Sequence, residues 1–379
     1  MKVVVVIPTY KEVENVKKII PAILDSFTKI PHHECHILVV DGNSPDGTGD
    51  AVKELSQKHP NVHLLMEKEK SGLGGAYIYA FKYTMQNMYP DVVMEMDADF
   101  QHNPNDIPRL IEKIEQGYDY VIGSRFTGGG SIPKEWSLNR KFWSVGGNIF
   151  SKIVLGIYSV SDFTSGFKAS RVKNYVDRLD LDSVRSKGFA YKIDLLYKMY
   201  KLNAKIAEVP IKFGLRDRGD SKMQGNNALD SLKVVLSIRI NENKNLVKFL
   251  CVGVVGFITD ATLFNVFRVT LFDSSLSAVI SGLIAIMVTF TLNNIWSFGE
   301  RKINGLVKIL GTFVVYSASS IIPILFRSQL VDLFVKALGD KAVVANTGFL
   351  IGIAFGLVWN YVVYSRLIWR KVKLSGEKG

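Results

Sequence analysis

Two aspartates one residue apart close an apolar run in the first half of the chain. Asp97-Ala98-Asp99 follows the run Val92–Met96, and Gln101 comes two residues later. Acidic side chains at positions i and i+2 of a strand end face the same site. Carboxylate and amide oxygens together suit a hard divalent cation that holds a diphosphate. An Asp-x-Asp pair alone is weak evidence, because acidic residues end strands in many proteins.

A second polar segment ends an earlier apolar run. Asp41-Gly42-Asn43-Ser44-Pro45-Asp46-Gly47-Thr48 follows His36–Val40. A turn that caps the next helix would explain this composition without any chemistry. Both interpretations hold if Asp46 or Thr48 caps the helix while Asp41 faces a nucleobase. The evidence for a ligand site is stronger if both segments lie at the same edge of one sheet.

The elements that must position these segments alternate between strand and helix. Val3–Ile7 is a β-branched run that stops at Pro8, as expected of a buried parallel strand. The remaining patterns predict strands at His36–Val40, Val62–Met66, Val92–Met96 and Val121–Gly123, and helices at Glu12–Ser26, Leu73–Gln86 and Asn105–Gln116. This alternation predicts an α/β domain with a mostly parallel sheet and helices on both faces. Ligands bind such sheets at the carboxyl ends of the strands, so Thr9–Glu12, Asp41–Thr48 and Asp97–Gln101 are expected along one edge.

Two later segments suit anionic ligands. Arg216-Asp217-Arg218-Gly219-Asp220-Ser221-Lys222 is basic and contains glycine, which fits a lid that closes over phosphates, with a solvated surface turn as the alternative. Arg140 and Ser144 are four residues apart on a predicted helix and therefore share one face. Their guanidinium and hydroxyl groups could contact the same lipid phosphate. The alternative is that Arg140 only binds anionic head groups.

The helix that carries Arg140 is predicted over residues 136–158. It combines apolar residues near helical spacing with interleaved basic residues, and Leu229–Ile240 repeats the mixture. Helices of this kind lie in the plane of a membrane interface, where apolar burial and anionic lipids hold them. Ordinary amphipathic core helices are the alternative. We favour the interface because Leu229–Ile240 leads directly into an apolar half of the chain.

That second half is predicted to cross a membrane. Hydrophobic residues make up 47% and charged residues 22% of the 379 residues, which excludes wholesale disorder. Four stretches after Asn245 are close to the roughly 20 residues that span a bilayer: Leu246–Phe267, Leu276–Phe298, Ile309–Phe326 and Val343–Ile368. Asp260 lies within the first stretch. A functional role and a structural one, at the outer interface or in a bond across the helix bundle, are equally compatible with that position.

The basic residues predict both partners and orientation. The formal net charge is +12, and much of the excess flanks the apolar stretches, so we expect membrane lipids and no nucleic acid as partners. The flanking basic residues on one side are Arg239, Lys244, Lys248, Arg301, Lys302, Lys308, Arg366, Arg370, Lys371 and Lys373. The positive-inside rule then puts both termini on the cytoplasmic side. Met1–Ile7 leads directly into Pro8 instead of a longer apolar region, so we expect no signal peptide and a cytosolic polar half.

Four segments follow from these patterns. We expect a cytosolic catalytic domain over residues 1–227, a second interfacial helix and linker over 228–245, a membrane domain of four helices over 246–370, and a cytoplasmic tail over 371–379. The ends of the second and fourth apolar stretches carry similar aromatic and amide residues, at Asn293–Phe298 and Trp359–Tyr361. This similarity is compatible with a duplicated two-helix unit.

Taken together and in this order, five motifs resemble glycosyltransferase family 2, in particular its dolichyl/polyprenyl-phosphate mannose synthase branch. They are Ile7-Pro8-Thr9-Tyr10-Lys11-Glu12, Asp41–Thr48, Asp97-Ala98-Asp99 with Gln101-His102, Gly123-Ser124-Arg125-Phe126 and Thr164-Ser165-Gly166-Phe167. The resemblance covers residues 1–240, and the apolar half resembles the GtrA-like membrane domain. The family usually has two adjacent acids where this chain has Asp41-Gly42, which affects the predicted contact with the nucleobase.

The resemblance implies a GT-A fold, which is Rossmann-like, and an inverting transfer of mannose from GDP-mannose to dolichyl or polyprenyl phosphate. It assigns Pro8, Tyr10, Glu12, Val39 and Asp41 to the nucleoside, Asp97 and Ala98 to the donor, and Asp99 and Gln101 to Mg²⁺ or Mn²⁺. It further assigns Arg216 and Lys222 to a mobile loop on the diphosphate, and Arg125, Arg140 and Ser144 to the lipid phosphate. The residues expected to act in catalysis are Asp97, Asp99, Arg125 and Lys222.

Other functions remain as alternatives. A related enzyme would use UDP-glucose and make polyprenyl-phosphate glucose. A protein of another class would transport lipid-linked sugars and use the polar half only to sense nucleotide sugars, which the intact Asp-Ala-Asp with Gln101 disfavours. A lipid phosphate is already an anion and needs no general base, so we expect His102 to be an ordinary hydrogen-bonded histidine. Catalysis then consists of positioning and charge neutralisation.

Overall fold

The computed structural model describes residues 1–215, 226–271, 274–339 and 342–370. The chain divides into two compact units, Met1–Arg239 and Ile240–Gly379. The division falls within helix α7 (Asn226–Glu242), inside the predicted linker. The finer limits of the four predicted segments stay a prediction.

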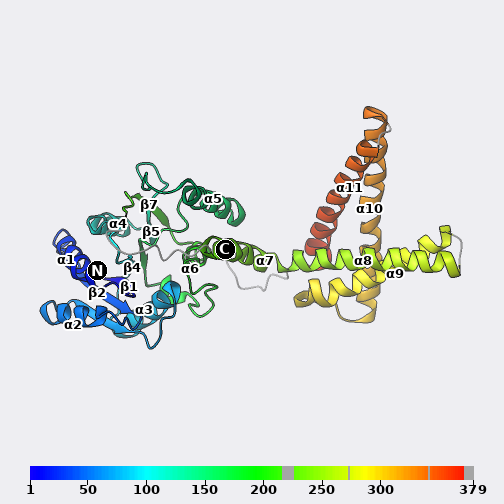
Figure 1. Ribbon diagram of the computed structural model, residues 1–379. Coiled ribbons are helices and arrows are strands. Elements are labelled where there is room, and N and C mark those ends of the chain that lie inside the picture. The colour runs from blue at the N-terminus through cyan, green and yellow to red at the C-terminus, as the bar shows by residue number, and fades with distance from the viewer. Residues whose placement is uncertain (216–225, 272–273, 340–341, 371–379) are drawn as a thin grey trace. The chain divides into compact units, whose positions relative to one another are not determined.

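The first unit is built on a seven-stranded sheet with the order β3-β2-β1-β4-β6-β5-β7 (Figure 1). The strands are β1 (Lys2–Thr9), β2 (Glu34–Asp41), β3 (Val62–Met66), β4 (Val92–Glu95), β5 (Tyr120–Ser124), β6 (Lys168–Arg171) and β7 (Ile206–Pro210). Only β6 among them runs antiparallel to its neighbours, β4 and β5. The predicted mostly parallel α/β sheet is therefore confirmed. Sequence patterns missed β6 and β7, because both are short and carry charged residues such as Lys168 and Glu208.

Helices cover both faces of this sheet. They are α1 (Val13–Phe27), α2 (Thr48–Lys58), α3 (Leu73–Asn87), α4 (Ile107–Glu115), α5 (Leu138–Leu155), α6 (Tyr191–Lys201) and α7. Alternate residues of β1 point to opposite faces. Val3 and Val5 join a core with α1 and α4, whereas Val4 and Val6 join a second core with α3 and α6. The β-branched run of β1 is fully buried because both of its faces are covered.

The parallel register brings the predicted site segments together. Thr9 at the end of β1 pairs with Asp41 at the end of β2, and β4 pairs with β1 on its other side. The segments Thr9–Glu12, Asp41–Thr48 and Asp97–Gln101 therefore leave the sheet at the same edge. We call these three segments the donor side.

The second unit is helical. Its helices are α8 (Lys244–Thr270), α9 (Ser274–Leu292), α10 (Leu306–Leu338) and α11 (Ala342–Val363), and α10 and α11 lie side by side in Figure 1. Within the described residues, three segments are long and apolar enough to cross a membrane: Lys244–Phe267, Ile280–Ser297 and Leu306–Pro323. Helix α10 itself is longer than the predicted third stretch, because it continues through Pro323 to Leu338. Helices in such surroundings tolerate an internal proline when neighbours satisfy the freed carbonyl.

The helices pair as α8 with α9 and α10 with α11, and the two pairs end alike. A π-helical turn follows each, at Asn293–Ser297 and at Tyr364–Ile368. An aromatic residue then donates its backbone N–H to the first carbonyl of the turn, Phe298 to Asn293 at 2.8 Å and Trp369 to Tyr364 at 2.7 Å. The rings of Phe298 and Trp369 stack with centroids 4.8 Å apart and planes 9° apart. This repeated local geometry supports a duplicated two-helix unit.

Polar contacts join these helices. The Ser281 hydroxyl of α9 donates to Asp260 Oδ1 of α8 at 2.6 Å, so Asp260 makes a bond across the helix bundle. At one end of the unit, Lys248 Nζ lies 3.3 Å from the Trp296 carbonyl oxygen, and Arg301 Nη1 lies 2.8 Å from that of Trp369. Basic residues that are far apart in sequence thus gather at the same end, as the positive-inside argument assumes.

Candidate active site

Asp41 organises the turn after β2. Its carboxylate is fully buried and accepts hydrogen bonds from Thr9 Oγ1 at 2.9 Å, from the Ser44 backbone N–H at 2.8 Å and from Ser44 Oγ at 2.6 Å. A carboxylate offers about four acceptor positions, and these bonds use three of them. They therefore do not by themselves prevent the contact with a nucleobase that the sequence predicts for Asp41.

Asp46 and Thr48 join the starts of two helices. Asp46 Oδ1 accepts from the Thr48 N–H at 3.2 Å, which satisfies the first donor of α2. Asp46 Oδ2 accepts from the Val13 N–H at 3.3 Å, and Thr48 Oγ1 accepts from the Glu12 N–H at 3.0 Å. The turn therefore holds the first residue of α2 and the start of α1, which follows Tyr10 and Glu12.

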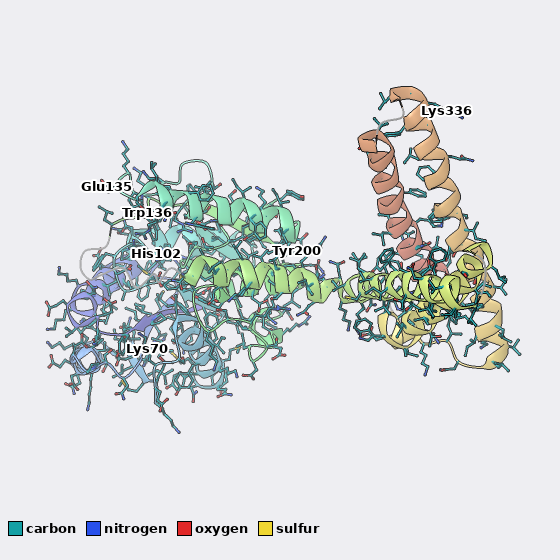
Figure 2. The ribbon with its side chains drawn as sticks, turned by 45° about the vertical axis from the view of Figure 1, so that its right-hand side comes forward. Lys70, His102, Glu135, Trp136, Tyr200 and Lys336 are labelled. Atoms are coloured by element: carbon teal, nitrogen blue, oxygen red, sulfur yellow. The ribbon has the colours of Figure 1, made fainter. Side chains whose placement is uncertain are left out.

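Gly42 stands where the family usually has a second acid, and a carboxylate from another strand lies near it. A Cβ on Gly42 would be 3.4 Å from Glu67 Oε2 and 3.4 Å from the Tyr10 ring. Glu67 is buried just after β3. Lys70, which is labelled in Figure 2, places its ammonium 3.8 Å from the centroid of the Tyr10 ring. Sequence reasoning missed Glu67 and Lys70, because no motif marks the segment after β3.

Asp99 and Gln101 form a compact oxygen-donor pair. Both are buried, with exposed fractions of 4% and 7%, and the Gln101 N–H donates to Asp99 Oδ1 at 3.1 Å. Gln101 Nε2 donates to the Gly214 carbonyl at 3.3 Å, which leaves the amide oxygen as its acceptor end. A carboxylate and an amide oxygen are ligands that Mg²⁺ and Mn²⁺ accept, so the residues present fit the predicted metal.

Each donor-side segment contains one non-glycine residue in the left-handed region. The φ angles are 56° at Lys11, 56° at Asn43 and 59° at Phe100. Non-glycine residues adopt this region at a cost, and such residues concentrate at functional sites. Phe100 lies in the bend between Asp99 and Gln101.

Asp97 faces two buried basic side chains. Lys192 Nζ lies 3.8 Å and His102 Nδ1 lies 3.9 Å from Asp97 Oδ2, and Lys192 is 3% exposed. Gly166 fits between them: a Cβ there would lie 2.5 Å from Lys192 Nζ and 2.7 Å from Asp97 Oδ2. Any larger residue at 166 would push this cluster apart. Sequence reasoning quoted the motif around Gly166 but missed Lys192.

The prediction for His102 is wrong. The side chain is buried, yet neither ring nitrogen makes a hydrogen bond to any residue that the structure describes. Its ring stacks on Phe167 at 5.3 Å between centroids and meets Phe213 edge-on at 5.2 Å. Burial lowers the pKa of His102 to about 4. The histidine is therefore a neutral packing residue between two aromatic rings.

A second set of side chains borders this edge from β5, the segment 162–166 and α5, and we call it the acceptor side. The Arg125 guanidinium binds both carboxylate oxygens of Asp162 at 2.7 Å, and its Nη2 also donates to Thr164 Oγ1 at 2.7 Å. Burial alone would raise the pKa of Asp162, but the Arg125 charge and hydrogen bonds hold it below its ordinary value. Arg125 is 8% exposed, so its charge is largely balanced within the protein.

One face of α5 points toward this pair. Asn148 Nδ2 lies 3.3 Å from Thr164 Oγ1, and its Oδ1 accepts from the Phe163 N–H at 2.6 Å. Arg140 and Ser144 precede Asn148 by eight and four residues and share its face. The Arg140 guanidinium lies 3.8 Å from the centroid of the Trp136 ring.

Aromatic rings connect this helix to the predicted metal loop. Trp136 meets Phe213 edge-on with centroids 5.8 Å apart, and Phe213 in turn contacts His102, which follows Gln101. Figure 2 labels Trp136 and His102 at the two ends of this set of rings. The predicted acceptor residues and the predicted metal ligands are therefore parts of one contiguous set of contacts. Whether each predicted residue binds its ligand stays a prediction.

The sequence compares closely with known enzymes. Residues 4–177 match the family described as glycosyl transferase family 2, and residues 248–369 match the GtrA/DPMS transmembrane domain. A dolichol-phosphate mannosyltransferase of Pyrococcus furiosus is 32% identical over 372 residues, which cover 97% of this chain and 99% of the relative. The chain belongs to glycosyltransferase family 2.

Two further relatives of this glycosyltransferase match its first unit. An undecaprenyl-phosphate mannosyltransferase of Micrococcus luteus is 40% identical over 225 residues, covering 59% of this chain and 88% of the relative. A polyprenol monophosphomannose synthase of Mycolicibacterium smegmatis is 37% identical over 235 residues, covering 61% and 84%. The match to the transmembrane domain, with the three apolar segments, makes the glycosyltransferase a membrane protein.

The other face of α5 in this glycosyltransferase is apolar and exposed. Its residues recur at helical spacing and are 39–84% exposed: Leu138, Phe142, Val145, Ile149 and Ile153. An ordinary amphipathic core helix would bury these side chains. Their exposure argues against that alternative. The predicted limits of 136–158 are too wide, because Trp136 and Ile157 are buried and Gly156 ends the helix in the left-handed region.

The predicted lid residues Arg216 and Lys222 lie outside the described residues. The described chain reaches Leu215, directly after Gly214, whose N–H donates to the Gln101 carbonyl at 2.9 Å. Gly214 therefore lies next to the predicted metal ligands.

Proposed function

We propose that this glycosyltransferase transfers mannose from GDP-mannose to dolichyl or polyprenyl phosphate, in an inverting reaction that depends on Mg²⁺ or Mn²⁺. The observation that carries the proposal is the contiguity of the donor side, with its Asp99–Gln101 pair, and the acceptor side, with Arg125 and Arg140. The names of the relatives, all mannosyl transferases to lipid phosphates, support the choice of sugar and acceptor.

The donor side has distinct tasks in this proposal. The Tyr10 ring and the Lys70 ammonium would contact the nucleoside. Asp41 and Glu67 would lie beside it, next to Gly42. Asp97 and Ala98 orient the sugar, and Lys192 holds Asp97 in place. Asp99 and Gln101 would hold the metal, which neutralises the charge on the leaving diphosphate when it is bound. Arg216 and Lys222 would close over that diphosphate.

The acceptor side needs only to bind and aim an anion. An oxygen of the lipid phosphate attacks the anomeric carbon, the bond from that carbon to the diphosphate oxygen breaks, and the electron pair leaves with the nucleoside diphosphate. No proton has to move, which agrees with a buried, neutral His102 near the site. Arg125, Arg140 and Ser144 would hold the lipid phosphate, and Arg125 would also fix the Thr164 segment beside it.

The location proposed for this reaction is the cytoplasmic surface of the cell membrane. The exposed apolar face of α5 would rest in the lipid interface, with the domain of residues 1–227 and both termini in the cytoplasm. A polyprenyl chain can then stay in the bilayer while its phosphate reaches the acceptor side.

The test is to incubate the purified protein with polyprenyl phosphate, divalent metal and a panel of nucleotide sugars, and to identify the glycolipid by mass. We expect a hexose on the lipid phosphate with GDP-mannose, and calorimetric binding of GDP in preference to UDP. Product only from UDP-glucose, with preference for UDP, would instead assign a glucosyltransferase. No product with any donor would favour a transporter that senses nucleotide sugars.

A further inference from the structure

A second cluster of ligand-type side chains lies at the other end of the sheet. His32 and His33 are in the turn before β2, and Glu115 is the last residue of α4. His32 Nε2 lies 3.0 Å and His33 Nε2 lies 3.1 Å from the same oxygen, Glu115 Oε1. All three ligand atoms lie within 4.8 Å of one another. The turn precedes β2, so the cluster is at the amino end of the strands, away from the donor side.

His33 supplies a second observation. Its side chain is 3% exposed, and its buried Nε2 lies 3.1 Å from Glu115 Oε1 as an ion pair, without a well-formed hydrogen bond to any residue that the structure describes. Buried polar atoms in proteins nearly always make a well-formed hydrogen bond, so a close contact without one calls for an explanation. Ligands that share one ion approach each other closely without bonding to each other. In a tetrahedral zinc site they are about 3.4 Å apart, close to the observed separation of His33 and Glu115.

The chemistry of the cluster differs from that of the donor side. Two imidazole nitrogens and a carboxylate suit a borderline ion such as Zn²⁺, with one position left for water. Mg²⁺ prefers oxygen ligands only, as at Asp99 and Gln101. His33 Nδ1 lies 3.3 Å from the Met1 nitrogen, so Nε2 is the nitrogen of this ring that faces the cluster.

We propose that His32, His33 and Glu115 form a binding site for a divalent transition metal, for which Zn²⁺ is the best fit. A bound ion would connect the turn before β2 to the end of α4, two segments that are 82 residues apart between His33 and Glu115. Binding to the folded state alone stabilises that state, so zinc should raise the thermal midpoint of the first unit.

A nearby histidine pair offers a matched control. His36 Nδ1 lies 3.1 Å from His63 Nε2, and His36 Nε2 lies 2.9 Å from Glu34 Oε1. These nitrogens have hydrogen-bond partners, unlike His33 Nε2. Replacing His36 therefore removes a histidine beside a carboxylate without touching the proposed site.

The experiment measures metal binding by the full-length protein in detergent, stripped of metal and supplied with excess Mg²⁺ to occupy the oxygen ligands. Equilibrium dialysis against Zn²⁺ should give one zinc per chain, and Co²⁺ should give the intense visible absorption of tetrahedral coordination. His32→Ala and Glu115→Gln should each weaken zinc binding about tenfold or more. Their side chains are 60% and 40% exposed, so both variants should keep the fold. His36→Ala and Asp99→Asn should bind zinc as the unchanged protein does.

Unchanged zinc affinity in both His32→Ala and Glu115→Gln would overturn the proposal, as would absence of zinc binding by the unchanged protein. An equal loss in His36→Ala would assign the zinc to the other histidine pair and also contradict it. The readout is metal binding and not transfer, so this result is separate from the proposed activity.

Discussion

The donor and acceptor sides of the catalytic edge are constructed differently. On the donor side, three short loops follow parallel strands, and most hydrogen bonds stay within a loop or pass to the adjacent one, as from Ser44 and Thr9 to Asp41. On the acceptor side, contacts join different kinds of element: Arg125 after β5 binds Asp162 in the segment 162–166, and Asn148 of α5 contacts Thr164. The donor side is thus a row of linked loops at strand ends, whereas the acceptor side joins a strand end, a loop and a helix.

This difference predicts how each side fails. A donor-side substitution should remove one chemical contribution and leave the rest of the protein intact. An acceptor-side substitution should instead change how the lipid phosphate is bound, with the donor still recognised. The following variants test the comparison.

Asp99→Asn should have the largest effect. It removes a charged ligand at a loop position that contributes little to the core, so the fold should remain. We expect kcat to fall about a hundredfold or more. Initial rates over a range of Mn²⁺ concentrations measure this loss. Near-normal turnover at low metal concentration would contradict the assignment of Asp99 as a metal ligand.

Gly166→Ala should have the second largest effect. The added methyl group would lie 2.5 Å from Lys192 Nζ and 2.7 Å from Asp97 Oδ2, so Asp97 has to move. A displacement of this size should lower kcat between about tenfold and a hundredfold. Gly128→Ala is the control, because a Cβ there would have no described atom within 4 Å. Equal activity of the two variants would show that Asp97 does not need its observed position.

Arg140→Ala tests the acceptor side. We expect the KM for polyprenyl phosphate to rise about tenfold, because a charge-assisted contact is lost, with calorimetric affinity for the nucleotide sugar unchanged. Arg140→Lys should rescue only partly, because an ammonium lacks the planar fork. Lys141→Ala removes a neighbouring charge whose Nζ donates to the Lys134 carbonyl, and should have little effect. Full activity of Arg140→Ala in neutral detergent at subsaturating lipid would contradict the proposed binding of the lipid phosphate by Arg140.

Phe142→Gln should have the smallest effect. The side chain is 68% exposed on the apolar face of α5, and its proposed role is to rest in lipid. Activity in vesicles should fall about two- to fivefold, with little change in detergent micelles. Tyr89→Gln, which changes a residue that is 75% exposed before β4, is the control. The same loss for both variants, or for Phe142→Gln in micelles, would exclude an interfacial role.

The same contrast explains what could be predicted from sequence. Strands β1 to β5 and the three donor-side loops follow from contiguous patterns, and the structure brings these loops to one edge as expected. Lys192 and Glu67 reach the site from elements without a motif, and Phe213 follows a short strand that no apolar run marks. His102 was assigned a hydrogen bond by its residue type, but its environment of aromatic rings decides otherwise.

The central claim is that the two sides form one metal-dependent mannosyltransferase. The most direct test is the rate at which the purified protein forms mannolipid from GDP-mannose and polyprenyl phosphate, before and after chelation of divalent metal. We predict a product with the mass of the lipid phosphate plus one hexose, formed only when donor, lipid and Mg²⁺ or Mn²⁺ are all present, and lost on chelation. Transfer that continues in excess chelator, or absence of a mannolipid with all three components present, would contradict the account.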